Sequence, residues 1–213
     1  MSWIQENQRQ GLMLISRCMQ KPGGWITERI ADGNLSESIL TLFQEKGSPD
    51  LSSHTLSRAL ADLQTMLKLY SQKMPEEIQK DLARQYVRWT TVETNTMTAV
   101  NAPSPFKEEA DPLSSYRHLP GQEIMEWYHC CGMKIPKRFV GRPDSIHMKL
   151  EFAVYLTGNI PRHPDDPDYQ KTYQAFLRRF LLPHLDRILT HRCGREQFPF
   201  YYLLCALIQA YLT

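Results

Sequence analysis

Apolar side chains recur every three or four residues along most of the chain, which is the spacing of one face of an α-helix. One clear stretch follows this period through Leu56, Ala59, Leu60, Leu63, Met66, Leu67 and Tyr70. A second stretch begins at Pro75, which suits the first turn of a helix, and continues through Ile78, Leu82, Tyr86 and Trp89. The pattern therefore predicts a helix over each stretch.

Shorter patterns predict further helices on either side. They lie around 12–19, ended by the breaker Lys21-Pro22-Gly23-Gly24, around 39–43, over 120–131, over 173–189 with a kink or restart near Pro183, and over 198–212. No alternating pattern of strand length accompanies them. The sequence thus predicts an all-α fold, a compact bundle of about eight or more helices without a sheet.

The segment 142–156 differs from the others because its apolar side chains surround the helix instead of forming one face. Pro143 presets φ for a helix start, and Asp144 is the expected N-cap. We expect this helix to lie at the centre of the bundle. Glu151 inside it must find a partner or face a groove, since an unpaired buried charge is costly.

Two segments interrupt the helical pattern. No apolar period is visible from Thr90 to Leu119, which predicts a long loop at about 90–119 that is either functional or disordered. Phe106 is its one large apolar side chain before Leu113, so we expect it to tether the loop to the body. A Pro- and Asp-rich segment at about 159–169 predicts a possible hinge. We interpret residues 1–213 as a single domain.

Charge and composition narrow the classes of protein. The net charge is +2, with 25 basic and 23 acidic residues, so there is no basic excess of the kind that holds nucleic acid. The first residues carry no apolar signal region, and no apolar run reaches the roughly 18 residues that span a bilayer. We expect a cytoplasmic protein with no nucleic-acid partner and no stable membrane insertion.

The sequence offers little evidence of catalytic or metal chemistry. Five cysteines without C-x-x-C spacing favour reduced thiols over a zinc site, and the usual nucleotide, metalloprotease and nucleophile motifs are absent. His147 and His184 lie near predicted helix ends, where capping or solvated roles are usual. Arg178 and Arg179 fall opposite an apolar stripe and are expected in solvent. No catalytic residue, metal or cofactor is therefore predicted.

One ordered set of segments resembles the TorD/DmsD/NarJ-like chaperones of molybdenum enzymes. Pro143-Asp144-Ser145-Ile146 followed by Leu150-Glu151-Phe152 is similar to the Pro-Asp-His-Ile and Leu-Glu-Phe signature of that family. The segments 82–89, 103–106 and 128–132 stand in the family's order. Two departures occur: Ser145 replaces the usual His, and Trp89-Thr90 replaces a common Leu-Phe.

The resemblance implies a TorD-like cytoplasmic chaperone that is not an enzyme. Its partners would be an apo-molybdopterin oxidoreductase and the twin-arginine signal peptide of that enzyme, held back from export until the cofactor is inserted. An aromatic groove with carboxylates suits such a leader, because arginine stacks on aromatic rings and pairs with carboxylates. The implied peptide-binding residues are Tyr86, Trp89, Phe106, Tyr128, Asp144, Ser145 and Glu151.

Alternatives stay open at the level of sequence. Asp144 can be only a helix cap, and Tyr86 and Trp89 can be only core residues. A helical DNA-binding or regulatory module would need a basic recognition helix, of which Arg84, Arg88, Arg178 and Arg179 give only weak signs. A small all-α enzyme is a third possibility. The chain is expected to be a monomer or a homodimer that swaps helices through 161–168.

Overall fold

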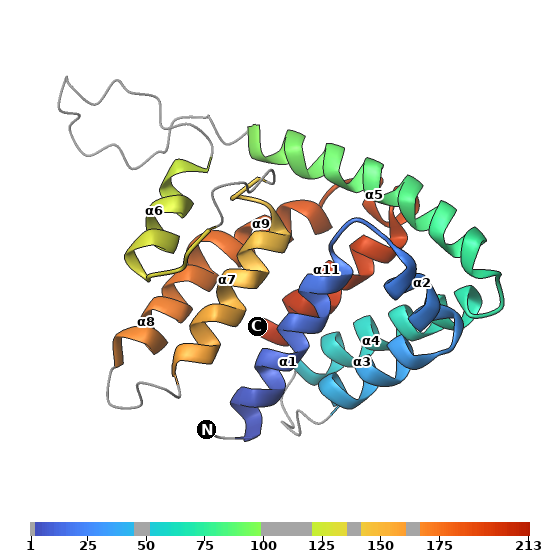
Figure 1. Ribbon diagram of the computed structural model, residues 1–213, viewed down its shortest axis with the longest axis horizontal. Helices are drawn as coiled ribbons and strands as arrows, with labels where there is room; N and C mark the ends of the chain where they lie inside the picture. Colours follow the sequence, from blue (N-terminus) through green and yellow to red (C-terminus); the bar gives the residue numbers. More distant parts are fainter. Residues whose placement is uncertain (1–2, 45–51, 99–120, 136–141, 161–166) are drawn as a thin grey trace.

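The computed structural model describes residues 3–44, 52–98, 121–135, 142–160 and 167–213 (Figure 1). Over these ranges every regular element is a helix, which confirms the all-α prediction. The elements are α1 (Trp3–Cys18), α2 (Gly24–Ala31), α3 (Asn34–Gln44), α4 (Ser52–Tyr70), α5 (Pro75–Thr98), α6 (Gln122–Cys130), α7 (Ile146–Asn159), α8 (Pro167–Phe176), the π-helical η3 (Leu177–Leu181), α9 (Leu182–Leu189), α10 (Gly194–Gln197) and α11 (Pro199–Leu212).

Two apolar helices, α7 and α11, organise the core. Helix α7 packs against α1, α8 and η3, whereas α11 packs against α4, α5, α9 and α10. Figure 1 shows α1 lying beside α7 and α5 running along one edge of the bundle. Ile146, Leu150, Phe152, Ala153 and Leu156 are all fully buried. The expectation that this helix lies at the centre is therefore confirmed.

The start of α7 differs by one residue from the prediction. Ser145 is the N-cap: its backbone is extended, with φ −65° and ψ 153°, and its hydroxyl accepts the N–H of Met148. The expectation that Asp144 caps the helix was wrong, because the Asp144 carboxylate is bound by Arg142 instead. A serine in this position satisfies one of the amides that a helix start leaves unpaired.

Helix α5 is longer than the apolar pattern predicts. It continues to Thr98, so the prediction of a loop was wrong for residues 90–98, while 99–120 lie outside the described residues. Its buried side is Ile78, Leu82, Gln85, Trp89 and Glu93, a helical series that ends in a charged side chain. Because position 93 carries a glutamate, hydrophobicity alone ends the stripe at Trp89.

The apolar pattern did not predict one short helix and predicted the break near Pro183 without its form. Helix α2 was not predicted, because it is short and begins directly after the 21–24 breaker. The restart expected near Pro183 is confirmed and takes the form of the π-helical η3. Proline has no N–H to donate to the carbonyl oxygen four residues before it, and a wider turn ahead of Pro183 accommodates that loss. Most of the possible hinge, residues 161–166, lies outside the described residues.

Candidate functional site

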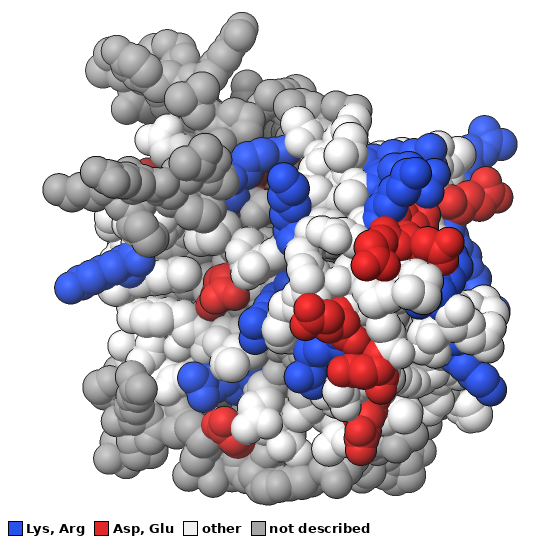
Figure 2. Space-filling view, turned by 45° about the vertical axis from the view of Figure 1, so that its right-hand side comes forward, with Lys and Arg blue, Asp and Glu red and all other residues white. Residues whose placement is uncertain are grey.

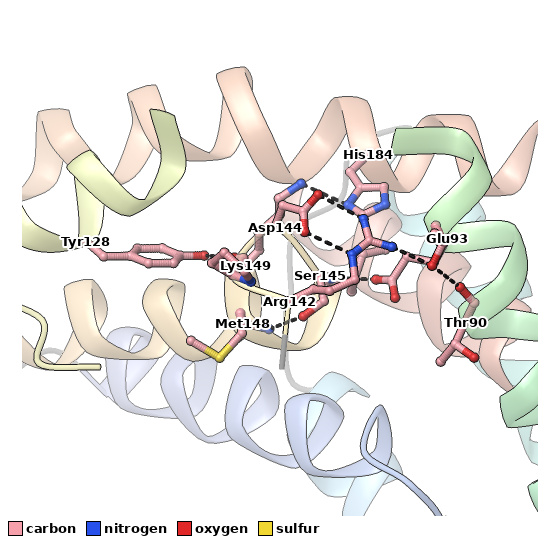
Figure 3. Close-up of polar contacts among 12 residues, drawn as sticks. Thr90, Glu93, Tyr128, Arg142, Asp144, Ser145, Met148, Lys149 and His184 are labelled. Atoms are coloured by element: carbon pink, nitrogen blue, oxygen red, sulfur yellow. Dashed lines mark hydrogen bonds and ion pairs between the residues drawn. The ribbon is translucent and has the colours of Figure 1, made fainter. Parts of the chain in front are cut away.

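The turn at residues 142–146 is the point where α5, α6 and the start of α7 are joined by hydrogen bonds (Figure 3). Tyr128 from α6 donates its hydroxyl to the carbonyl oxygen of Pro143 at 2.8 Å. Glu93 from α5 accepts the amide of Ile146 on Oε1 at 2.6 Å. Both tethering side chains are buried. The backbone of the turn is thus fixed from two helices that are distant in sequence.

A paired guanidinium and carboxylate lie within this turn. The Nε of Arg142 donates to Oδ1 of Asp144 at 3.2 Å, and its Nη2 donates to Oδ2 at 2.9 Å. Arg142 also reaches the hydroxyl of Thr94 on α5. The Asp144 side chain is only 5% exposed, whereas that of Arg142 is 36% exposed. The pair therefore spans from the interior to the surface of the protein.

A buried lysine and histidine lie behind the turn. Lys149, on the central helix α7, donates from Nζ to Nδ1 of His184 on α9 at 2.9 Å. Neither side chain is exposed by more than 2%. The Nε2 of His184 has no hydrogen-bond partner among the described residues. The expectation that His184 is a capping or solvated residue was wrong, because tertiary packing places it fully inside.

Burial changes the ionisation of these groups. Desolvation lowers the pKa of Lys149 to about 7, although the nearby Asp144 and Glu93 carboxylates oppose this shift. Desolvation raises the pKa of Glu93 to about 7, against the amide of Ile146 and the charge of Arg142. Burial, followed by the neighbouring Lys149, lowers the pKa of His184 well below its usual value. His184 is therefore neutral near pH 7, which suits an Nδ1 that accepts from Lys149.

The structure brings three of the predicted site residues together. Asp144 and Ser145 lie in the turn, and the Tyr128 hydroxyl holds Pro143 beside them. The ring of Tyr128 packs against Phe152 of the central helix, with ring centroids 4.7 Å apart. Tyr128 itself is fully buried, so its role in this state is to support the turn.

Two further predicted residues lie on α5. Trp89 is buried, stacks on Tyr201 and meets Phe198 edge-on, so its ring belongs to the core. Tyr86 is half-buried and packs against the same Tyr201 ring at 5.8 Å. Of the two, only Tyr86 presents part of its surface to solvent. Phe106 lies outside the described residues.

Glu151 has found a partner on another helix. The hydroxyl of Ser16, on α1, donates to Oε1 of Glu151 at 2.6 Å. The same hydroxyl lies 3.0 Å from Nδ1 of His147. Glu151 is half-buried, which fits a carboxylate that joins α1 to α7 and keeps one edge near solvent.

Sequence reasoning missed four residues of this site: Glu93, Arg142, Lys149 and His184. Two of them left a signal in the sequence. Lys149 is a charge inside a helix that is apolar on nearly every side, and Glu93 stands four residues after Trp89, where the stripe would continue. Arg142 and His184 left none, since only the fold shows what they contact.

The charged side chains can be followed on one face of the molecule. On the face in Figure 2 the basic side chains are scattered among acidic ones and form no stripe. Arg178 and Arg179 are exposed, as predicted. In the described parts of the chain, no group of three or more His, Cys, Asp or Glu side chains is arranged to hold a metal ion. No helix found there is long and apolar enough to cross a membrane.

Comparison with known families extends these observations. The model of the nitrate reductase delta subunit family matches residues 51–190, which is more than half of the chain. The matched range includes α5, α6, α7 and α9 and thus the whole 142–146 turn with its contacts. No curated protein and no solved structure matches the sequence. The chain belongs to the nitrate reductase delta subunit family, the NarJ/TorD-like chaperones that assemble molybdoenzymes.

Proposed function

We propose that this chaperone captures the twin-arginine leader of an apo-molybdopterin oxidoreductase in the cytoplasm and holds the precursor back from export until the cofactor is inserted. The family acts with nitrate reductase-type molybdoenzymes, which supports an oxidoreductase as the partner. The capture site in this proposal is centred on the 142–146 turn. Tyr86, Trp89, Phe106, Tyr128, Asp144, Ser145 and Glu151 remain its proposed contributors.

The observation that carries the proposal is the bidentate pair of Asp144 and Arg142. The Asp144 carboxylate already accepts two hydrogen bonds from a guanidinium, which is the group that a twin-arginine leader presents. A planar fork of this kind distinguishes arginine from lysine. A leader arginine that reached Asp144 would replace Arg142, whose partly exposed side chain can turn outward.

The remaining proposed residues differ in how they contribute. Tyr86 and Ser145 are partly exposed and can touch a peptide directly. Tyr128 and Trp89 are buried and act by supporting the turn and α5. Glu151 is bound by Ser16, so its contribution to a peptide site passes through the position of α1.

A binding experiment tests the proposal. A synthetic peptide with an Arg-Arg-x-Phe-Leu core and a following apolar segment is titrated into the protein by calorimetry. We expect a Kd in the micromolar range or better, equivalent to about −8 kcal/mol. A matched peptide with Lys-Lys in place of Arg-Arg should bind at least about tenfold more weakly, because lysine lacks the fork. No measurable heat of binding for the leader peptide, and no competition between peptides for the protein, would contradict leader capture.

Variants of the protein locate the site. Asp144→Asn keeps the size of the side chain but removes the charge that pairs with a guanidinium, so leader affinity should fall about tenfold or more. Asp62→Asn is the matched control, because Asp62 also pairs with an arginine, Arg195, but lies on α4 away from the turn. Equal affinities for the two variants would move the site away from Asp144.

A further inference from the structure

Glu93 lies on α5 and binds the backbone of the 143–152 family signature at the start of α7. Its Oε1 accepts the N–H of Ile146, the first residue of α7, at 2.6 Å, and its side chain is buried. The first amides of a helix have no partner within the helix. Ser145 satisfies the amide of Met148, so the first turn of α7 is capped by two side chains. One is local, and the other comes from α5.

The adjacent residue of α5 holds the other end of the same turn. Thr94 accepts a hydrogen bond from Arg142, while Glu93 accepts one from Ile146. The turn at 142–146 is therefore fastened at both ends by consecutive residues of one helix (Figure 3). Asp144 and Ser145 lie between these two fastenings, of which only the bond from Ile146 to the buried Glu93 holds the backbone of the turn itself.

A glutamate is a costly choice at this position if only folding mattered. The buried side of α5 otherwise carries Ile78, Leu82, Gln85 and Trp89, and an apolar residue at 93 would continue that series into the core. Burying a carboxylate costs free energy even when it is hydrogen-bonded, and here the carboxylate accepts the buried Ile146 amide, which an apolar side chain would leave without this acceptor. What the buried carboxylate does at this cost is fix the position of the 142–146 turn.

We propose that Glu93 is a positioning residue for peptide capture, which holds the 142–146 turn against α5 so that Asp144 meets a peptide guanidinium. This inference rests on the proposed function, because it assigns Glu93 a role at the same site. Glu93 acts through Ile146 and the turn and has no contact with the peptide. The side chain also ties the turn to the helix that carries Tyr86 and Trp89.

Two variants test this role, each compared with the wild-type protein. Glu93→Leu removes the acceptor of the buried Ile146 amide and a carboxylate near Lys149 and Arg142, so we expect a lower melting temperature, together with leader binding that is at least about tenfold weaker at a temperature where the variant is fully folded. Glu93→Gln keeps an oxygen acceptor for the Ile146 amide and should restore affinity to within about threefold of wild type. Binding measured on the fully folded variant separates positioning from stability, because a loss of stability alone would leave the affinity of the folded protein unchanged.

A second measurement is independent of peptide binding. Amide hydrogen exchange of Ile146, followed by NMR, should be at least about tenfold faster in Glu93→Leu than in wild type and close to wild type in Glu93→Gln. Glu28→Leu is the matched control, since Glu28 is an exposed glutamate on helix α2. This control should change neither the affinity for the leader peptide nor the hydrogen exchange rate of the Ile146 amide.

The outcomes are distinct for the two proposals. If the wild-type protein binds no leader, the proposed function fails, and the exchange rate of Ile146 still decides whether Glu93 fixes the turn. Unchanged Ile146 exchange in Glu93→Leu overturns the positioning role. Wild-type affinity in Glu93→Leu, or no rescue by Glu93→Gln, overturns it as well.

Discussion

One of the two side chains that cap the central helix is a hydroxyl group. Ser145 stands at the position where the family usually has histidine, and its Oγ accepts the amide of Met148. Removing a capping hydroxyl costs about 1 kcal/mol on the usual scale. We therefore expect Ser145→Ala to lower the free energy of unfolding by about 1 kcal/mol in urea titrations. Ser71→Ala, at an exposed serine beyond the end of α4, is the control and should change it by less than about 0.5 kcal/mol.

The buried amine of Lys149 should leave a signature in the pH dependence of stability. Its folded pKa, about 7, lies below the ordinary value of 10.5, so between these values the unfolded chain holds more protons. The free energy of unfolding must therefore rise with pH over this window through this group, with a limiting slope of about 1.4 kcal/mol per pH unit. Lys149→Met should lose that rise between pH 7 and 9. Parallel profiles of the two proteins would contradict the shift.

Glu93 acts in the opposite direction over a lower range. Its folded pKa, about 7, lies above the ordinary value of 4.5, so the folded protein holds more protons between these values. This contribution to stability is fully present below pH 4.5 and is lost as pH rises to about 7. Glu93→Gln should remove this decrease in the free energy of unfolding. Urea titrations of both proteins at pH 5 and pH 7 measure the difference.

At the scale of elements, the contacts that hold the 142–146 turn depend on the length of α5. The helix passes beyond Trp89 to Glu93 and Thr94, the two residues that fasten the turn. Threonine hydroxyls along this part bond to carbonyl oxygens one turn back, as Thr91 does to Val87 and Thr94 does to Thr90. These bonds satisfy the threonine hydroxyls but do not themselves stabilise the helix, so the extension past Trp89 depends on the contacts of Glu93 and Thr94 with the 142–146 turn.

A proline at position 91 distinguishes the helix from a loop. Thr91 is exposed, so Thr91→Pro changes the backbone without disturbing the core. Proline inside a helix removes one hydrogen bond and clashes with the preceding turn, which costs about 3 kcal/mol or more. We expect a loss of that size in urea titrations, against less than about 0.5 kcal/mol for the control Thr91→Ala. A small loss for the proline variant would favour a loop.

At the scale of the whole molecule, α1 shows that the core extends beyond the matched family region. Helix α1 precedes residue 51, yet it packs along α7 and supplies Ser16 to Glu151. Its Leu12 and Ile15 are fully buried in the same core as residues of α9 and α11. The structure around the site therefore depends on a helix that the family match does not include.

The prediction of a single domain has a direct test in cooperative unfolding. Leu12 on α1 and Ile188 on α9 are both fully buried, so each alanine variant should lose about 2–5 kcal/mol. If 1–213 is one domain, both variants should shift a single transition, seen together by tryptophan fluorescence and circular dichroism. Met13→Ala, at a side chain that is 46% exposed, is the control with little effect. Separate unfolding transitions would indicate that the chain consists of more than one domain.

Local periodicity explains both what was predicted correctly and what was missed. Helices with an apolar face, such as α4 and α11, follow from the spacing of side chains, because burying such a face is what stabilises them. Helix α2 and residues 90–98 escaped because their helical signal is carried by polar contacts and by neighbouring elements. The site shows the same division: Asp144, Ser145 and Tyr128 came from a signature, whereas Arg142 and His184 left no local mark.

The sequence by itself determined the all-α class, the central position of α7 and the family signature at 143–152, since each of these depends on residues close together in the chain. Only the tertiary structure decided that Ser145 and not Asp144 caps α7, that Asp144 holds a guanidinium, and that Lys149 meets His184 35 residues away. It also decided that Glu93 reaches Ile146 across 53 residues. Hydrogen bonds over such separations depend on how helices pack, and periodicity along one helix carries no information about the partner that the next helix will supply.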